Sequence, residues 1–123
     1  LGTYIVNSFM DNTPSETFDD MLVRVAGETN TTLPVMIDKE TRLDATTAGA
    51  GNRFIYSYTL VNFSKGEVDT SALRKSMEPS LIANYKSNPQ MKEFRDENVE
   101  LVYQYKDRNG EFLLEIAVNP SVF

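Results

Sequence analysis

The stretch VELVYQYKDRNGEFLLEIAV, residues 99–118, decides the fold because it encodes a β-hairpin. Its Asn109-Gly110 pair is the strongest short hairpin signal, since both positions of the turn require residues that tolerate positive φ. Pairing across this turn brings six apolar residues onto one face: Tyr105 with Leu114, Tyr103 with Ile116, and Leu101 with Val118. The other face is mixed, and one apolar face beside one wetter face is typical of antiparallel sheet.

A first helix is predicted after a lead-in segment, residues 1–12. Thr13 can cap it, with Pro14 at the first helical position, and Glu16 completes a capping box. The apolar residues that follow recur with the spacing of one buried helix face: Phe18, Met21, Leu22, Val25 and Ala26. Asn30, which tolerates a left-handed conformation, marks the predicted end.

A second helix is predicted from a cap at Asp69 or Thr70. Its apolar residues recur every four positions: Leu73, Met77, Leu81 and Tyr85. Pro79 lies inside this pattern, and a proline there removes a backbone hydrogen bond and crowds the preceding turn. We therefore expect a kink or two helical pieces at Pro79, followed by a short helix that opens at Asn88-Pro89.

Two further strands are predicted before the second helix. Leu33–Asp38 is the first, followed by a polar segment over Lys39–Asp44 and a small-residue loop over Ala45–Asn52. Arg53–Phe63 is the second, because it is rich in aromatic and β-branched residues. Its larger side chains alternate onto one face: Phe54, Tyr56, Tyr58 and Leu60.

These elements follow one another in the order α-β-β-α-β-β. That order predicts an α+β fold, with a four-stranded antiparallel sheet and helices packed on one of its faces. Residues 2–11 would supply a fifth strand if they pair with the sheet. We expect a single domain over residues 13–123.

Composition excludes several kinds of chemistry. The chain has 123 residues, a net charge of −6, and neither His nor Cys. Imidazole and thiolate catalysis and imidazole metal sites are therefore ruled out, and we assign no catalytic residue, metal or cofactor. The negative charge disfavours a nucleic acid partner, and no apolar run is long enough to span a membrane.

The densest charged stretch, DKETRLD over Asp38–Asp44, is a candidate ligand-binding site. Asp38 and Asp44 could supply carboxylates for acid–base work or oxygen ligands for a hard cation, and Arg42 between them could bind an anionic group. The structural alternative is a strand end at which Arg42 pairs with Asp38 or Asp44. We favour this alternative, because such pairs are common structural devices.

Four tyrosines form the other candidate site. The predicted faces place them together on the sheet: Tyr56, Tyr58, Tyr103 and Tyr105. Such a group could be a platform on which a ligand stacks. It could equally be a core whose hydroxyls reach the rim, and the many aliphatic residues on the same face favour the core.

The central segment resembles a family of small uncharacterised bacterial domains. The shared pattern is LPxMxDxxTRLD…AG…YxYTLVN, which this chain carries between Leu33 and Asn62, and the resemblance extends over residues 13–123. Members often follow a signal peptide or membrane helix, which implies a location outside the cytoplasm. Many also carry two cysteines where this chain has Lys86 and Phe123, so it cannot form the disulfide that they imply.

These observations favour a binding or interaction module over an enzyme. Its partner would be a protein or a small molecule, and a homodimer is one arrangement. An enzyme that uses the Asp38–Asp44 carboxylates or Arg42, assisted by a tyrosine, is the first alternative. An immunity-type protein that blocks another protein is the second, because its acidity suits that role.

Overall fold

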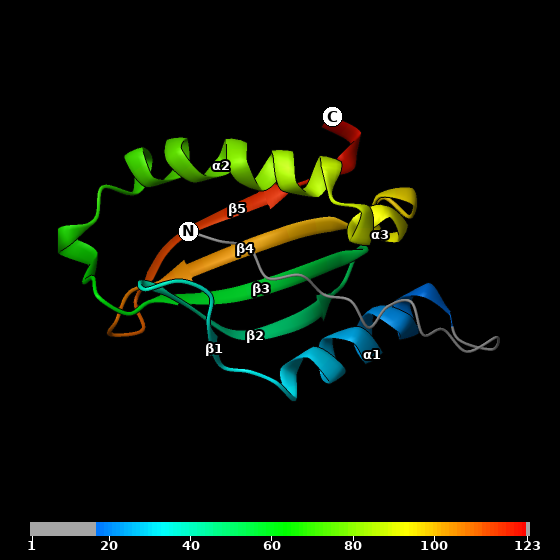
Figure 1. The fold of residues 1–123 in the computed structure, drawn as a ribbon, viewed down its shortest axis with the longest axis horizontal. Coiled ribbons are helices and arrows are strands. Elements are labelled where there is room, and N and C mark those ends of the chain that lie inside the picture. Colours follow the sequence, from blue (N-terminus) through cyan, green and yellow to red (C-terminus); the bar gives the residue numbers. More distant parts are fainter. Residues whose placement is uncertain (1–16, 123) are drawn as a thin grey trace.

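The computed structural model describes residues 17–122, which form a mixed α and β architecture (Figure 1). Its elements in chain order are α1 (Phe18–Asn30), β1 (Val35–Met36), β2 (Thr41–Gly49), β3 (Arg53–Leu60), η2 (Lys65–Glu67), α2 (Thr70–Ser87), η3 (Pro89–Met91), α3 (Lys92–Asp96), β4 (Glu100–Lys106), β5 (Phe112–Val118) and η4 (Pro120–Val122). The predicted α+β class is confirmed.

The sheet has five strands in the order β1-β2-β3-β4-β5. Every neighbouring pair is antiparallel except β3 and β4, which are parallel. The predicted wholly antiparallel sheet is therefore wrong at its centre. The cause is the connection between these two strands: α2 carries the chain back along the sheet, so β4 starts beside the start of β3, and parallel strands need such a crossover.

The fifth strand comes from a segment that was predicted to be polar turn and loop. β2 covers Thr41–Gly49 and pairs with β3 at every residue except Asp44. The two strands are joined through Gly51 and Asn52, which both adopt positive φ, at 79° and 63°. The predicted strand over Leu33–Asp38 shrinks to β1, because the side chain of Asp38 bonds the next backbone amides and turns the chain into β2. A strand over residues 2–11 lies outside the described residues.

The helices match their apolar patterns. The N-cap of α1 is Thr17, whose hydroxyl accepts a hydrogen bond from the Asp20 amide, whereas the predicted start over residues 13–16 lies outside the described residues. The side chain of Asp69, one of the two predicted caps, caps α2. α2 then continues through Pro79 as one helix, so the two separate pieces do not form. Pro79 is exposed, and α2 buries its other side through Met77 and Leu81.

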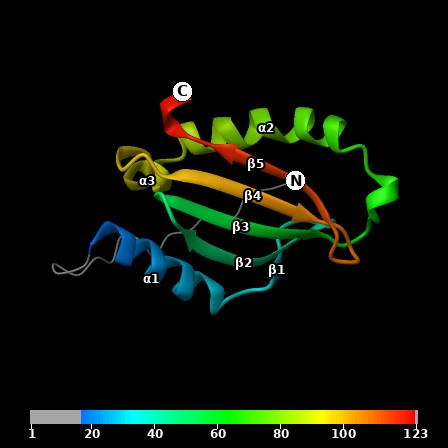
Figure 2. The same cartoon turned by 180° about the vertical axis from the view of Figure 1, so that it is seen from behind.

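One apolar core joins the two long helices to one face of the sheet. α1 lies along the β2 side and α2 along the β5 side (Figures 1 and 2). Between them the buried face of the central strands contributes Phe54, Tyr56, Tyr58, Leu60, Leu101, Tyr103 and Tyr105 to the same cluster as the helix residues. The predicted hairpin register is confirmed, with Tyr105 opposite Leu114 and Tyr103 opposite Ile116.

Candidate functional site

Arg42 and Asp44 form a closed polar cluster on the sheet. Arg42 Nε donates to Asp44 Oδ1 at 2.6 Å, and the Thr59 hydroxyl donates to Asp44 Oδ2 at 2.5 Å. Lys106 Nζ lies 3.9 Å from the same oxygen. Asp44 stands at an irregularity of β2, between paired Leu43 and Ala45. Both oxygens of this carboxylate are thus already occupied by neighbouring side chains.

Asp38 shapes the turn between β1 and β2. Its Oδ1 accepts the backbone amides of Glu40 and Thr41, each at 2.8 Å. A carboxylate that bonds the amides two and three residues ahead is a common turn device. This arrangement agrees with the structural alternative for the charged stretch, with Arg42 paired to Asp44 rather than to Asp38.

The four tyrosines form a stacked layer inside the core. The rings of Tyr56 and Tyr103 lie 5.2 Å apart with planes 8° from parallel, and those of Tyr58 and Tyr105 lie 4.9 Å apart at 11°. All four residues are at most 2% exposed. Burial raises the pKa of the Tyr103 hydroxyl, and burial followed by the nearby Asp38 charge raises the pKa of Tyr105. Both hydroxyls therefore stay protonated at neutral pH.

The charged cluster and the tyrosine layer lie on opposite faces of the sheet. Arg42 pairs with Thr59, whereas the next residue of β2 pairs with Tyr58. Because successive residues of a strand point to opposite faces, Arg42 and Tyr58 cannot face one cavity. The structure therefore brings Arg42 and Asp44 together and the four tyrosines together, but it keeps the two groups apart. Asp38 is the exception, because its charge reaches Tyr105.

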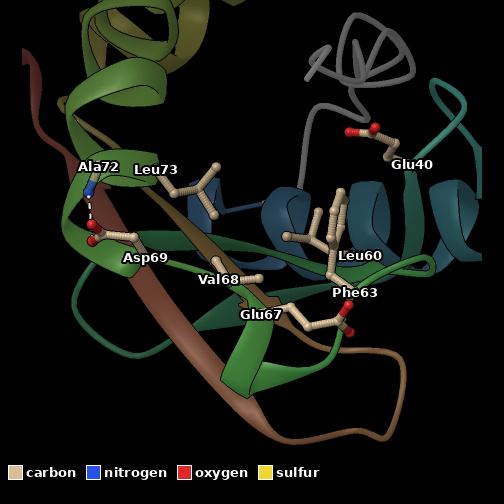
Figure 3. A pocket seen from close by; sticks show the side chains of 8 residues that line it. All are labelled: Glu40, Leu60, Phe63, Glu67, Val68, Asp69, Ala72 and Leu73. Carbon is tan, nitrogen blue, oxygen red and sulfur yellow. Dashed lines mark hydrogen bonds between the residues drawn. The ribbon is translucent and has the colours of Figure 1, made fainter.

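A different hollow opens where β3 ends and α2 begins, and we call it the α2 pocket (Figure 3). Its volume is about 380 Å³, within the range of small-ligand sites. Five apolar residues and three carboxylates line it: Leu60, Phe63, Val68, Ala72, Leu73, Glu40, Glu67 and Asp69. Only Glu40 belongs to a predicted candidate site, the charged stretch Asp38–Asp44. No local motif predicts the rest of the pocket, since its lining comes from the β1–β2 turn, the end of β3, the following connection and the first turn of α2.

The η2 connection forms one wall of the α2 pocket and is closed by a capping box. Glu67 Oε1 accepts the Ser64 amide at 2.9 Å and the Ser64 hydroxyl at 2.7 Å. Arg108 Nη1 lies 3.2 Å from the same oxygen. The Ser64 hydrogen bonds are the main cause that lowers the pKa of Glu67, and Arg108 adds to it. This carboxylate is therefore ionised and already held.

Asp107, fully buried in the β4–β5 turn, fixes that wall from the other side. Its Oδ2 accepts the Lys65 amide at 2.8 Å, while Oδ1 accepts the amides of Asn109 at 2.8 Å and Glu111 at 2.9 Å. Burial alone would raise the pKa of Asp107, but these backbone hydrogen bonds and Arg108 lower it. The sequence identified Asp107 only as part of a turn, because its partner Lys65 is 42 residues away.

A second hollow, of about 450 Å³, lies between α2 and β5. Polar and basic residues of α2 form much of its wall: Thr70, Ser71, Arg74 and Lys75. Arg74 Nη2 donates to the backbone oxygen of Glu115 at 2.5 Å, so a side chain already bridges the helix and the strand here. The α2 pocket, with its apolar floor, is the better candidate for a binding site.

Within residues 17–122, no group of three His, Cys, Asp or Glu side chains is arranged to hold a metal ion. In the same part of the chain, no helix is long and apolar enough to cross a membrane.

The sequence profile of a family described as a domain of unknown function (DUF8479) matches residues 17–114. The chain belongs to this family. The match includes most of the described fold and every residue of the α2 pocket. The expected relation to a family of uncharacterised domains is thus confirmed. A comparison with curated proteins finds no relative of this DUF8479 domain.

Three solved structures share the fold of the DUF8479 domain. One is a protein from Pseudomonas aeruginosa described as secreted (PA3611), with 17% identity, a TM-score of 0.65, and coverage of 85% of this chain and 95% of the other. The second is EpsS, a pilotin of the type 2 secretion system of Vibrio vulnificus, with 13% identity, a TM-score of 0.63, and coverage of 82% and 86%. The third is the type II secretion pilotin AspS from Vibrio cholerae, with 14% identity, a TM-score of 0.60, and coverage of 84% and 89%.

Proposed function

We propose that this domain works outside the cytoplasm as a binding module that holds a segment of a partner polypeptide in the α2 pocket. The pocket carries the proposal, because it is an apolar hollow of about 380 Å³ whose wall is held by the hydrogen bonds of Glu67 and Asp107. Apolar hollows that receive one or two large side chains are the usual anchors of protein interfaces. The opposed faces of Arg42 and Tyr58 count against the alternative of a carboxylate and arginine enzyme.

The similar folds support the location and the kind of partner. One such protein is described as secreted, and two are pilotins of type 2 secretion systems. A polypeptide of a secretion apparatus is therefore the first partner to test. The resemblance to domains that follow a signal peptide or membrane helix points to the same side of the membrane.

Site-specific photo-crosslinking in the native host tests this proposal. A photoreactive phenylalanine at Ala72, which lines the α2 pocket, should give an adduct with one envelope protein, mapped by mass spectrometry to one segment. The same residue at Ala83, exposed on the same helix but outside the pocket, is the matched control. Equal adducts from both positions, or none from Ala72, would count against the pocket as the binding site.

A pocket-filling variant sharpens the test. Leu73→Trp places a larger side chain in the lining and should abolish the Ala72 adduct while the domain remains folded. Fractionation of the full-length gene product should place it outside the cytoplasm, and a purely cytoplasmic product would contradict the proposed location.

A further inference from the structure

Of the three carboxylates at the α2 pocket, only Glu40 has no partner within the described part of the chain. Glu67 accepts two hydrogen bonds from Ser64 and pairs with Arg108. Asp69 caps α2 by accepting the amides of Ser71 and Ala72, each at 3.1 Å. No hydrogen bond or ion pair joins the Glu40 carboxylate to any residue between 17 and 122. Its charge is thus available to a ligand.

The backbone of Glu40 is fixed on both sides. Its amide donates to Asp38 Oδ1 at 2.8 Å, and its carbonyl oxygen accepts the Val61 amide at 2.9 Å. The carboxylate is therefore presented from an anchored turn rather than from a loose loop. Fewer degrees of freedom are lost when such a group binds a ligand, so its contribution to affinity is larger.

A second polar group near Glu40 also lacks a partner. The hydroxyl of Thr41 is fully buried and makes no hydrogen bond in the described structure. Thr41 lies opposite Leu60 in the ladder, on the sheet face that floors the pocket. Thr41 does not itself line the pocket, so the recognition of a positive charge rests on Glu40.

We infer that the α2 pocket selects a polypeptide segment in which a lysine or arginine stands next to a large apolar side chain, with Glu40 meeting the positive charge. The apolar neighbour would lie on Leu60, Phe63 and Leu73. The net charge of −6 adds a long-range attraction for a basic segment. This inference rests on the proposed function, since it names the chemistry of the ligand of the same site.

Selection from a random library of 12-residue peptides displayed on phage, with the full chain immobilised, tests the inference. Enriched peptides should combine a basic residue with an adjacent bulky apolar one. Synthesised and titrated against the labelled protein, they should shift the NMR signals of Val68 and Ala72. Glu40→Gln should raise the dissociation constants of these peptides about five- to tenfold, and Glu40→Lys should raise them further. Glu97→Lys is the control, because Glu97 is exposed at the opposite end of β3, where Asn52 bonds its carbonyl.

The outcomes separate this inference from the proposed function. Enriched peptides without basic residues, or peptides that bind Glu40→Lys as well as the native chain, overturn the charge selection while leaving a peptide site in the pocket. Hexylammonium tests the other source of the same chemistry: saturable shifts at Val68 and Ala72, with no peptide enriched, would identify a free amine as ligand and overturn the polypeptide. No enrichment and no shifts with hexylammonium would overturn both.

Discussion

Two buried tyrosine hydroxyls have opposite surroundings. The hydroxyl of Tyr85 donates to the backbone oxygen of Val99 at 2.6 Å, which ties α2 to the strand that follows α3. The hydroxyl of Tyr105 is buried without a hydrogen bond in the described structure. A buried polar group that is satisfied stabilises a fold, and one that is not satisfied costs free energy. The two residues therefore allow a matched comparison of the same chemical change.

Removal of each hydroxyl should change stability in different ways. Tyr85→Phe leaves the Val99 oxygen without its donor and should lower the free energy of unfolding by about 1 to 3 kcal/mol. Tyr105→Phe removes an unsatisfied group at nearly constant volume and should leave the free energy of unfolding unchanged or raise it by about 1 kcal/mol. Urea denaturation measures both values. Equal losses in the two variants would contradict this account of the hydroxyls.

At the scale of single elements, strong local sequence signals were sufficient to predict where a helix or hairpin forms. The apolar alternation on either side of Asn109-Gly110 predicted the register of β4 and β5 correctly, although only Gly110 adopts positive φ and the two-residue turn does not form. The four-residue apolar spacing located α2. β2 could not be found in this way, because Thr41–Gly49 contains only one large apolar residue, Leu43. Its pairing with β3 makes it a strand, and such tertiary context overrides weak propensity.

The α2 pocket could not be predicted from the sequence for a related reason. Its lining joins Glu40, Leu60 and Leu73 through folding, and no local motif links these positions. The charged and tyrosine-rich motifs were conspicuous in the sequence, yet the structure uses Arg42 and Asp44 in a closed ion pair and stacks the tyrosines in the core.

Pro79 gives a prediction at the scale of α2. A proline inside a helix lacks the amide that would bond the carbonyl of residue 75, and its cost is about 3 kcal/mol relative to alanine. Because Pro79 is exposed, Pro79→Ala should restore this bond without disturbing the core. We expect the free energy of unfolding to rise by about 1 to 3 kcal/mol.

The neighbouring exposed residue supplies the control. Ser80→Ala changes helix propensity but no backbone donor, so it should raise stability by less than about 0.7 kcal/mol in the same urea experiment. If Pro79→Ala raises the free energy of unfolding by no more than Ser80→Ala does, the missing hydrogen bond at Pro79 does not destabilise α2.

At the scale of the whole molecule, long-range polar contacts hold the connection between β3 and α2. The Asp107 carboxylate accepts a hydrogen bond from the Lys65 amide, and the Arg108 amide donates to the Phe63 backbone oxygen at 2.9 Å. These contacts join the β4–β5 turn to the wall of the α2 pocket. The wall of the pocket therefore depends on hydrogen bonds between residues that are remote from one another in the sequence.

Acid should weaken this arrangement in a defined direction. The pKa of Asp107 in the folded chain lies below its ordinary value of 3.8, and the pKa of Glu67 lies below 4.5. Protonation therefore favours the unfolded chain. The stabilisation from both carboxylates is fully present above about pH 5 and is lost as the pH falls through their folded-state pKa values.

Asp107→Asn separates the charge of Asp107 from its shape. An amide cannot accept all three backbone bonds, so the variant should unfold at a lower urea concentration at pH 7. It has no carboxylate to protonate, so the difference from the native chain should narrow as the pH is lowered from 5 towards 2. Urea denaturation at a series of pH values measures this difference, and Glu97→Gln, at an exposed carboxylate, controls for the change in net charge. A difference that stays constant with pH would mean that the shape of Asp107, and not its charge, holds the pocket wall.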